Sequence, residues 1–449
     1  MTARISVDAI RECLEGALPS MIATCAADGT PNVSYVSQVN YVDGTHVALT
    51  FQFFNKTREN VLANARAALL VVHPQTAARF RLEIEYLRTE TEGPLFESMK
   101  AKLAGIASHT GMVGVFKLRG ADVYRVHDIR QVPGKVLPAT TPRRNLLASL
   151  RACAQTFTRC NELDALLEEL LAALAEHLEI THSMVLMLDA PGRRLYTVAS
   201  RGYPQSGVGS EIALGCGVIG VAAEQRTPIR ISHMSAEYSY GRAMRESAEL
   251  AGLGARLETA IPLPGLADSR SQLAAPIVAG GELLGALYVE SPQDLRFSYD
   301  DEDALVAIAA QLGMALRALH EGEAAAEPAA APAGKPAPAV GAPVIVKHYA
   351  ADDSVFLGED YLIKGVAGAI LRKLLADYLR EGRTEFTNRE LRLDASIRLP
   401  DLSDNLEARL VLLHKRLAER SDALRLEKSG RGRFRLRVNR PVQLVEMPR

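Results

Sequence analysis

Residues 273–316 carry the clearest structural signal in the chain. Two apolar runs flank the dipeptide Gly280-Gly281, which is typical of two hydrophobic strands joined by a hairpin. After Tyr299 the period changes, and an acidic start precedes apolar residues three or four positions apart, at Leu305, Ile308, Leu312 and Leu316. This spacing is typical of an amphipathic helix, whose N-terminus favours negative charge. The sequence therefore predicts a closing strand pair followed by an exit helix.

The composition is that of an ordinary water-soluble protein. The 449 residues have room for two to four domains at about 150 residues each. Apolar runs stay well short of the ~20 residues that span a bilayer, and the first residues lack the apolar core of a signal peptide. The five cysteines show no C-x-x-C spacing, so no disulfide framework is expected. We expect a cytoplasmic protein that does not associate with a membrane.

The net charge of −1 conceals an uneven distribution along the chain. Residues 346–449 contain 21 Lys and Arg against 16 Asp and Glu, a net charge of +5. The first 140 residues have a net charge of +2, which leaves −8 for the middle of the chain. Only the C-terminal part therefore has a charge that suggests nucleic acid as a partner.

Two breaks divide the chain into a multidomain α+β protein. Residues 321–343 form an Ala/Pro tract without an apolar period, which is typical of a semi-rigid tether. A second break lies near Pro133-Gly134 and residues 140–142, where strand-like alternation gives way to a helical pattern. We expect domains at residues 1–140, 142–320 and 344–449, with the tether at 321–343.

The first domain reads as β-rich segments with two hairpin signals, Asp28-Gly29 and Asp43-Gly44. A strand that ends near Phe51 is followed by a polar cluster, a short helix and another strand. This segment resembles the FMN-binding split barrel of the pyridoxamine 5′-phosphate oxidase superfamily. The resemblance implies that Asn55, Lys56 and Thr57 hold the flavin phosphate.

By the same resemblance, Thr50 and Phe51 would lie near the isoalloxazine ring of FMN. A basic side chain and a hydroxyl at a helix N-terminus suit an anion. The preceding strand lacks the basic residue that the family supplies there, and the substrate signature of the oxidase is absent. The alternative is that Lys56 and Arg58 form only the solvated first turn of a helix.

The middle domain begins with two helical patterns, over residues 146–160 and 163–178. Two strands follow, and then a Gly-rich turn, a short helix, the break Thr227-Pro228 and a further strand. Together with the closing strands and exit helix, this order resembles a GAF domain, an antiparallel sheet with flanking helices that senses small molecules. The apolar stripes on residues 146–160 and 305–319 also predict a homodimer.

Four residues are candidates for binding the small-molecule ligand of the GAF pocket. Cys216 stands between two glycines, where it is either a reactive thiol or a small buried one. The segment around residues 238–242 lies where GAF domains carry the loop over their pocket. Tyr238 and Tyr240 could stack on a planar ligand there and Arg242 could pair with an anion, or the segment is an ordinary surface loop.

The C-terminal domain begins with a short strand and a helix over residues 362–379. Thr387 stands three residues before Glu390, which predicts a capping box at a second helix. A third helix is expected over residues 405–420, followed by two alternating strands around a Gly-rich turn. This order resembles the winged helix of response-regulator effector domains, whose third helix enters the major groove of DNA.

Five cations would then contact duplex DNA. The helical projection puts Arg409, Lys415 and Arg416 on the solvent face together with Leu412, while Arg431 and Arg433 lie at the hairpin tip. The alternative is that this domain binds protein, because a charged helix face is more often simply solvated.

The sequence thus predicts a signal-responsive regulator that senses a flavin or another small ligand and acts on DNA. A flavin-dependent oxidoreductase with a regulatory GAF domain is the alternative from another class, and a scaffold without catalytic activity is a third. The sequence contains no Ser-His-Asp arrangement, P-loop or metal-ligand spacing. Hydrolases, kinases and metalloenzymes are therefore disfavoured, whereas flavin chemistry is not, because there the cofactor supplies the reactivity.

Overall fold

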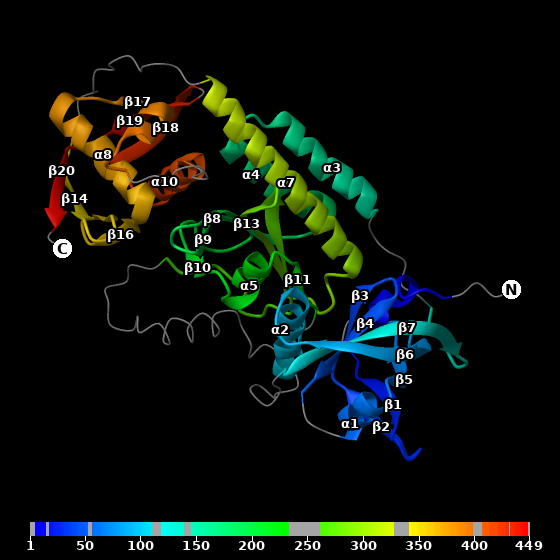
Figure 1. Ribbon diagram of the computed structural model, residues 1–449. Coiled ribbons are helices and arrows are strands. Elements are labelled where there is room, and N and C mark those ends of the chain that lie inside the picture. Colours follow the sequence, from blue (N-terminus) through cyan, green and yellow to red (C-terminus); the bar gives the residue numbers. More distant parts are fainter. Residues whose placement is uncertain are drawn as a thin grey trace.

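The computed structural model describes residues 5–14, 18–52, 56–109, 118–138, 145–232, 261–326, 341–397, 406–430 and 432–447. The strands in these segments form four sheets, which follow one another along the chain. Figure 1 shows the N-terminal sheet in blue and cyan, the central sheet in green and the C-terminal sheets in yellow to red. No helix of the described residues is long and apolar enough to cross a membrane.

The N-terminal sheet has seven strands in the order β2-β1-β5-β6-β7-β4-β3. The strands are β1 (Ser20–Cys25), β2 (Pro31–Val36), β3 (Val39–Asp43), β4 (His46–Phe51), β5 (Arg66–Val72), β6 (Arg79–Glu90) and β7 (Gly120–Val132). The helices are η1 (Asp8–Leu14), α1 (Lys56–Ala63) and α2 (Pro94–His109). Both predicted hairpins are present, β1 with β2 and β3 with β4. This is a split-barrel-like domain, as the sequence predicted.

The two faces of strand β4 show how this domain is packed. Val47 and Leu49 point into the barrel core, whereas Ala48 packs on the opposite side against Met99 and Leu103 of α2. Helix α2 also contacts strand β11 and helix α5 of the central domain (Figure 1). The barrel is therefore joined to the central domain through the outer side of its own sheet.

The central domain is built on a six-stranded sheet in the order β10-β9-β8-β13-β12-β11. The strands are β8 (His182–Asp189), β9 (Arg194–Arg201), β10 (Glu211–Ala213), β11 (Ile229–Ile231), β12 (Ser271–Ala279) and β13 (Glu282–Ser291). The helices are α3 (Leu146–Arg159), α4 (Leu163–Leu178), α5 (Gly217–Gln225) and α7 (Tyr299–Ala326). This is the GAF-type architecture that the sequence predicted.

Alternate residues of the central strands bury opposite faces of this sheet. Val185 and Leu287 pack under α3, α4 and α7, while Leu186 and Ala286 pack under α5. The predicted hairpin at Gly280-Gly281 and the helix that follows it are confirmed. Helix α7 continues to Ala326, so the predicted tether does not begin at residue 321, because Glu and Ala favour a helix.

The C-terminal segment has two small sheets. The strands are β14 (Val344–Tyr349), β15 (Ser354–Leu357), β16 (Asp360–Ile363), β17 (Glu385–Thr387), β18 (Leu424–Gly430), β19 (Arg433–Val438) and β20 (Val442–Met447). The helices are α8 (Gly365–Glu381), α9 (Asn388–Leu393) and α10 (Leu406–Arg420). Strand β20 returns to pair in parallel with β14, while β17, β19 and β18 form the second sheet.

The predicted capping box is confirmed at the start of α9. The Glu390 backbone N–H donates to Thr387 Oγ1 at 3.2 Å, and the Thr387 backbone N–H donates to Glu390 Oε2 at 3.1 Å. These bonds satisfy two of the amide groups that a helix start leaves without partners. They fix the point at which β17 turns into α9.

Candidate functional sites

Helix α10 lies against α4 and β9 of the GAF domain, which cover much of the face that the helical projection assigned to solvent. Leu412, which the helical projection placed on the solvent face, is 3% exposed. A Cβ atom at Gly209 would lie 3.5 Å from Leu412 Cδ1, so the backbone that precedes β10 packs directly on the helix. The projection was wrong on this point because it assumed that only the opposite face of α10, which carries Leu406, Leu410, Leu413 and Leu417, would be covered.

Two of the three cations predicted on this helix face are also buried. Arg409 is 8% exposed, and its Nη2 donates to Asp189 Oδ1 at 2.7 Å. Arg416 is 3% exposed, and its Nε donates to the carbonyl oxygen of Leu362 at 3.0 Å. Burial lowers the pKa of the Arg416 guanidinium. Neither side chain is free to contact a large partner in this arrangement.

Further ion pairs connect the C-terminal segment to acidic residues of the GAF domain. Lys415 Nζ lies 2.9 Å from Asp164 Oδ1 and 3.3 Å from Glu168 Oε1, both on α4. Other pairs are Lys428 with Glu162 at 3.2 Å and Lys364 with Glu211 at 3.0 Å. The basic C-terminal part thus neutralises the acidic middle of the chain, in accord with the charge distribution in the sequence.

Of the two remaining DNA-binding candidates, the structure describes Arg433 of the β18–β19 hairpin. Arg433 begins β19, is partly buried and lines a cavity beside α10. Arg431 is outside the described residues. Along β19 the exposed positions carry Arg435 and Arg437, which pair with Glu385 and Glu427. Part of the positive charge of the hairpin is therefore already neutralised.

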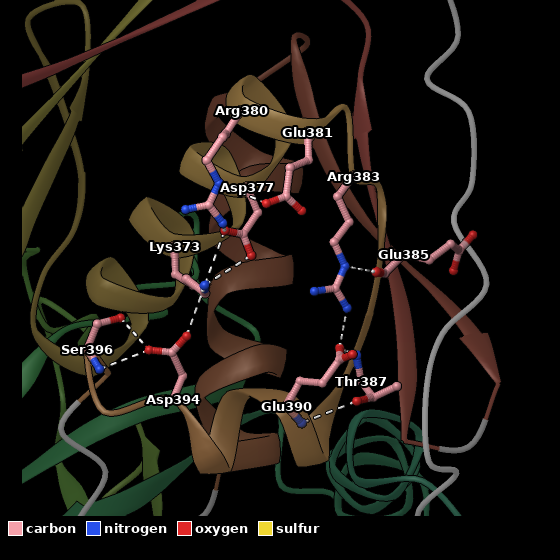
Figure 2. A network of polar contacts seen from close by, with 10 residues as sticks. All are labelled: Lys373, Asp377, Arg380, Glu381, Arg383, Glu385, Thr387, Glu390, Asp394 and Ser396. Atoms are coloured by element: carbon pink, nitrogen blue, oxygen red, sulfur yellow. Dashed lines mark hydrogen bonds and ion pairs between the residues drawn. The ribbon is translucent and has the colours of Figure 1, made fainter.

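A polar network holds α8, β17 and α9 together (Figure 2). Lys373 of α8 bridges Asp377 and Asp394 at 3.1 and 3.0 Å. Arg383 donates to the carbonyl oxygen of Glu385 at 3.1 Å and also to the capping-box residue Glu390. Asp377 is 3% exposed, so its pairing offsets the cost of burying its charge. The network fixes the two short elements that precede α10.

In the barrel, a cavity of about 130 Å³ lies beside strand β4 and the start of α1. Three of the predicted flavin-binding residues line it, namely Thr50, Phe51 and Thr57. The Thr57 hydroxyl lies 2.9 Å from both Asn32 Nδ2 and Ser34 Oγ. The structure thus brings three of the five predicted residues to one place.

The other two predicted residues are not placed in this cavity. Lys56 is not among the lining residues, and its side chain is 57% exposed with Nζ 4.0 Å from Glu59 Oε2. Asn55 lies outside the described residues. The cation in the cavity is Arg58, which donates to the carboxylate of Asp122 and lies 4.1 Å from the centre of the Phe51 ring.

The sequence alone did not single out Asp122 as a partner of Arg58. The two residues are far apart in the chain and meet only because β7 pairs with β4. Thr57 and Arg58 bring a hydroxyl and a guanidinium to this cavity, where the Asp122 carboxylate already pairs with Arg58. Pockets that hold a whole small-molecule ligand have volumes of about 300 Å³ or more. The cavity lined by the described residues is smaller, so it admits only part of an FMN molecule.

In the GAF domain, Cys216 is the N-cap of α5 and is partly buried beside an apolar cluster. The other ligand candidates, Tyr238, Tyr240 and Arg242, lie outside the described residues. A buried carboxylate was missed by the sequence analysis. Glu290 of β13 is 1% exposed and accepts a hydrogen bond from the Leu266 backbone N–H at 3.0 Å. Burial raises the pKa of Glu290 above its ordinary 4.5.

A cluster of cations around Tyr299 joins the barrel to the GAF domain. Arg11 and Lys102 of the barrel lie 4.6 and 5.8 Å from the centre of the Tyr299 ring. On the GAF side, Arg230 lies 4.1 Å from the same ring and pairs with Glu302 at 2.7 Å. Cations are attracted to the face of an aromatic ring. Because Tyr299 begins α7, the barrel contacts the first turn of the exit helix.

Comparisons with known families agree with the first two domains. Residues 6–127 match the pyridoxamine 5′-phosphate oxidase family model, and residues 162–316 match the GAF domain model. No curated protein matches the chain. The chain thus combines a split-barrel domain of the pyridoxamine 5′-phosphate oxidase type with a GAF domain.

Solved structures similar to parts of this chain include the GAF domain of a phosphoenolpyruvate-protein phosphotransferase from Acinetobacter. It is 23% identical, with a TM-score of 0.30, over 39% of this chain and 94% of that one. An FMN-binding protein from Syntrophomonas wolfei is 16% identical, with a TM-score of 0.24, over 28% of this chain and 84% of that one. Free methionine-R-sulfoxide reductase from Neisseria meningitidis is 17% identical, with a TM-score of 0.32, over 39% and 91%.

Proposed function

We propose that this protein is a signal-responsive regulator whose C-terminal segment is a winged helix that binds duplex DNA after leaving the GAF domain. The observation that carries the proposal is the contact of α10 with the GAF domain. The pairs of Arg409 with Asp189 and of Lys415 with Asp164 occupy charges that would otherwise meet phosphates. In this proposal, carboxylates of the GAF domain occupy the positions that the phosphates of a DNA duplex would take.

The order of the C-terminal elements supports the winged-helix interpretation. Helix α8 is followed by strand β17, helices α9 and α10, and a hairpin that pairs with β17. In a winged helix the last helix enters the major groove and the hairpin contacts the backbone. The +5 net charge of residues 346–449 supports a nucleic-acid partner over a protein partner.

The barrel and the GAF domain are the proposed sensors. A flavin is the proposed ligand of the barrel, with Thr57 and Arg58 at its phosphate and Phe51 near its ring. Bound there, it would supply electron transfer, while the chain's own residues bind and orient it. The cluster around Tyr299 offers a route from the barrel to α7, because Arg11 and Lys102 hold the first residue of that helix.

A flavin-dependent oxidoreductase is the second candidate function. The family match over residues 6–127 favours it, because that family is named for an oxidase. An experiment distinguishes the two candidates. If the protein is an oxidoreductase, the purified protein turns over a reduced or oxidisable substrate, whereas a sensor binds flavin without turnover. The absorption spectrum of the purified protein near 450 nm decides first whether a flavin is bound at all.

DNA binding is tested by fluorescence polarisation of labelled duplexes with the full chain at increasing salt. Each phosphate that the protein neutralises contributes ~0.9 to the slope of log affinity against log salt. Replacement of Arg431 and Arg433 by alanine should therefore flatten this slope by about two units. The loss should be alike for all sequences, because phosphate contacts position a protein and do not read bases. Failure of any duplex to bind at low salt would assign the segment to a protein partner.

A further inference from the structure

Two buried side-chain amides at the barrel cavity lack hydrogen-bond partners. Gln52, which follows β4, is 7% exposed and lines the cavity. Its Nε2 donates to Ser37 Oγ at 3.0 Å, while its Oε1 has no partner among the described residues. Gln38, which precedes β3, is 1% exposed, and neither atom of its amide has a partner in the same part of the chain. Because buried amides are almost always hydrogen-bonded, the two glutamines indicate a ligand group that satisfies them.

Strand pairing holds Gln38 at the edge of the same cavity. Its carbonyl oxygen accepts a hydrogen bond at 3.2 Å from the backbone N–H of Thr50, and Thr50 lines the cavity. Thr50 lies on β4, two residues before Gln52, and β4 pairs with β3. The two amides therefore come from adjacent ends of paired strands, although they are 14 positions apart in the sequence.

The lining of the cavity has two polar ends. At one end the hydroxyls of Thr57 and Ser34 lie 2.9 Å apart, and at the other Gln52 donates to Ser37 at 3.0 Å. Ser34 and Ser37 are three residues apart at the end of β2, which corresponds to about 10 Å at ~3.3 Å per residue. The amides are therefore well separated from Thr57, the proposed position of the flavin phosphate.

The charges in the lining favour an uncharged ligand group at the amide end. Among the described residues that line the cavity, only Arg58 and Asp122 carry a charge, and they pair with each other. A carboxamide offers donors and an acceptor side by side, and it binds an edge that presents the complementary pattern, as Asn and Gln do with adenine. The pyrimidine edge of a flavin ring has such a pattern, because an N–H group lies between two carbonyl oxygens.

We propose that Gln52 and Gln38 recognise the imide edge of the flavin ring, which consists of the N3–H group and the carbonyl groups on either side of it. Gln52 Oε1 accepts from N3–H, and the Gln38 amide donates to a neighbouring carbonyl oxygen. The phosphate lies at the Thr57 end, and the apolar part of the ring projects out of the cavity, which is too small for the whole molecule. This inference rests on the proposed flavin site and adds the residues that select the ring there.

Two ligands that differ only at this edge test the proposal on the unaltered protein. FMN and 3-methyl-FMN, in which a methyl group replaces the N3 hydrogen, are titrated into the full chain, and flavin fluorescence is followed. FMN should bind the wild type roughly fivefold more tightly, as expected for one hydrogen bond. Gln52→Leu should lose most of this preference, whereas the control Gln75→Leu, at an exposed turn, should keep it. Equal affinities of the wild type for the two ligands would overturn the proposal.

The stability of the flavin-free protein gives a second measurement. A buried amide without a partner destabilises the folded state, and an apolar side chain of similar size does not. Gln38→Leu should therefore raise the midpoint of thermal unfolding without flavin, while it weakens FMN binding roughly fivefold. If the Gln38 amide served only the fold, its replacement would lower the midpoint and leave FMN affinity unchanged, and this result would refute its role.

A third ligand separates this inference from the proposed function. UMP has the same imide edge and a phosphate but lacks the fused rings of a flavin, so it should bind more weakly than FMN. Binding of UMP as tight as that of FMN would assign the imide to a nucleotide and refute the flavin. Failure of FMN to bind the wild type would refute the proposed flavin site together with this inference. Binding of FMN without preference over 3-methyl-FMN would refute this inference alone.

Discussion

Arg409 of α10 donates to Asp189 of β8 at 2.7 Å, and its guanidinium lies 3.9 Å from the centre of the Tyr196 ring. The pair joins the C-terminal segment to the GAF domain across a long stretch of sequence. Arg409 is 8% exposed, so the ring and the carboxylate together replace the water that its charge has lost.

Asp189→Ala should therefore destabilise the full chain by about 1–3 kcal/mol, because it leaves a mostly buried guanidinium without its anion. The measurement is denaturant unfolding followed by circular dichroism. Asp303→Ala is the control, because Asp303 is 62% exposed in its ion pair with Arg11. This substitution should lower the free energy of unfolding by only about 0–1 kcal/mol. Equal losses in the two variants would mean that the Arg409 pair is not a buried one.

Flavin binding in the barrel should depend more on Arg58 than on Lys56. Arg58 lines the cavity, whereas Lys56 is exposed beside Glu59, although the resemblance to flavin-binding barrels implied Lys56. FMN titration of the full chain, followed by flavin fluorescence, should show a loss of about 1.5–3 kcal/mol for Arg58→Ala and a smaller loss for Lys56→Ala. The reverse order would restore Lys56 as the phosphate ligand.

Glu290 should make the stability of the GAF domain depend on pH. Burial raises its pKa in the folded protein above the ordinary 4.5, so folding favours the protonated carboxyl. The resulting stability is fully present below about pH 4.5 and is lost as pH rises through the raised pKa. Glu290→Gln mimics the protonated form. Its midpoint of thermal unfolding should be higher than that of the wild type at pH 8 but not at pH 4. A constant difference between the two proteins at all pH values would contradict this.

The apolar stripes from which a homodimer was predicted pack largely inside the GAF domain, where Cys153, Leu305 and Leu312 are fully buried. We still predict a homodimer, now through exposed apolar side chains on the same two helices. Leu147 of α3 is 77% exposed and Met314 of α7 is 64% exposed. Exposed apolar surface on neighbouring helices often marks an interface. Sedimentation at tens of micromolar should give a dimer for the wild type and a monomer for the pair Leu147→Glu and Met314→Glu. A monomeric wild type would remove the dimer from the account.

Local patterns in the sequence predicted the fold well. The Gly280-Gly281 hairpin, the amphipathic exit helix and the capping box of Thr387 and Glu390 are each encoded within a few residues. The end of α7 was placed too early, because a low-complexity Ala/Glu segment suits both a tether and a helix.

Contacts between distant segments were beyond the reach of such patterns. Arg58 meets Asp122 through strand pairing, and α10 meets the GAF domain through tertiary packing. One signal was present in the sequence: Leu412 on the predicted solvent face of α10 indicated that this face would be covered. The opposite net charges of the middle and C-terminal parts of the chain indicated that the acidic middle part covers this face.

The central claim is that the GAF domain holds α10 away from DNA. Asp164→Asn combined with Asp189→Asn removes two of the carboxylates that pair with α10 and leaves the size of the side chains unchanged. Duplex-DNA polarisation at low salt should show at least roughly tenfold tighter binding by this variant than by wild type, as expected if each pair contributes about 1 kcal/mol. The slope of log affinity against log salt should also be shallower for the wild type than for the variant. In the wild type, salt weakens the DNA contacts but also weakens the ion pairs that hold α10 on the GAF domain. Equal affinities for DNA in the two proteins, or no binding by either, would contradict the claim.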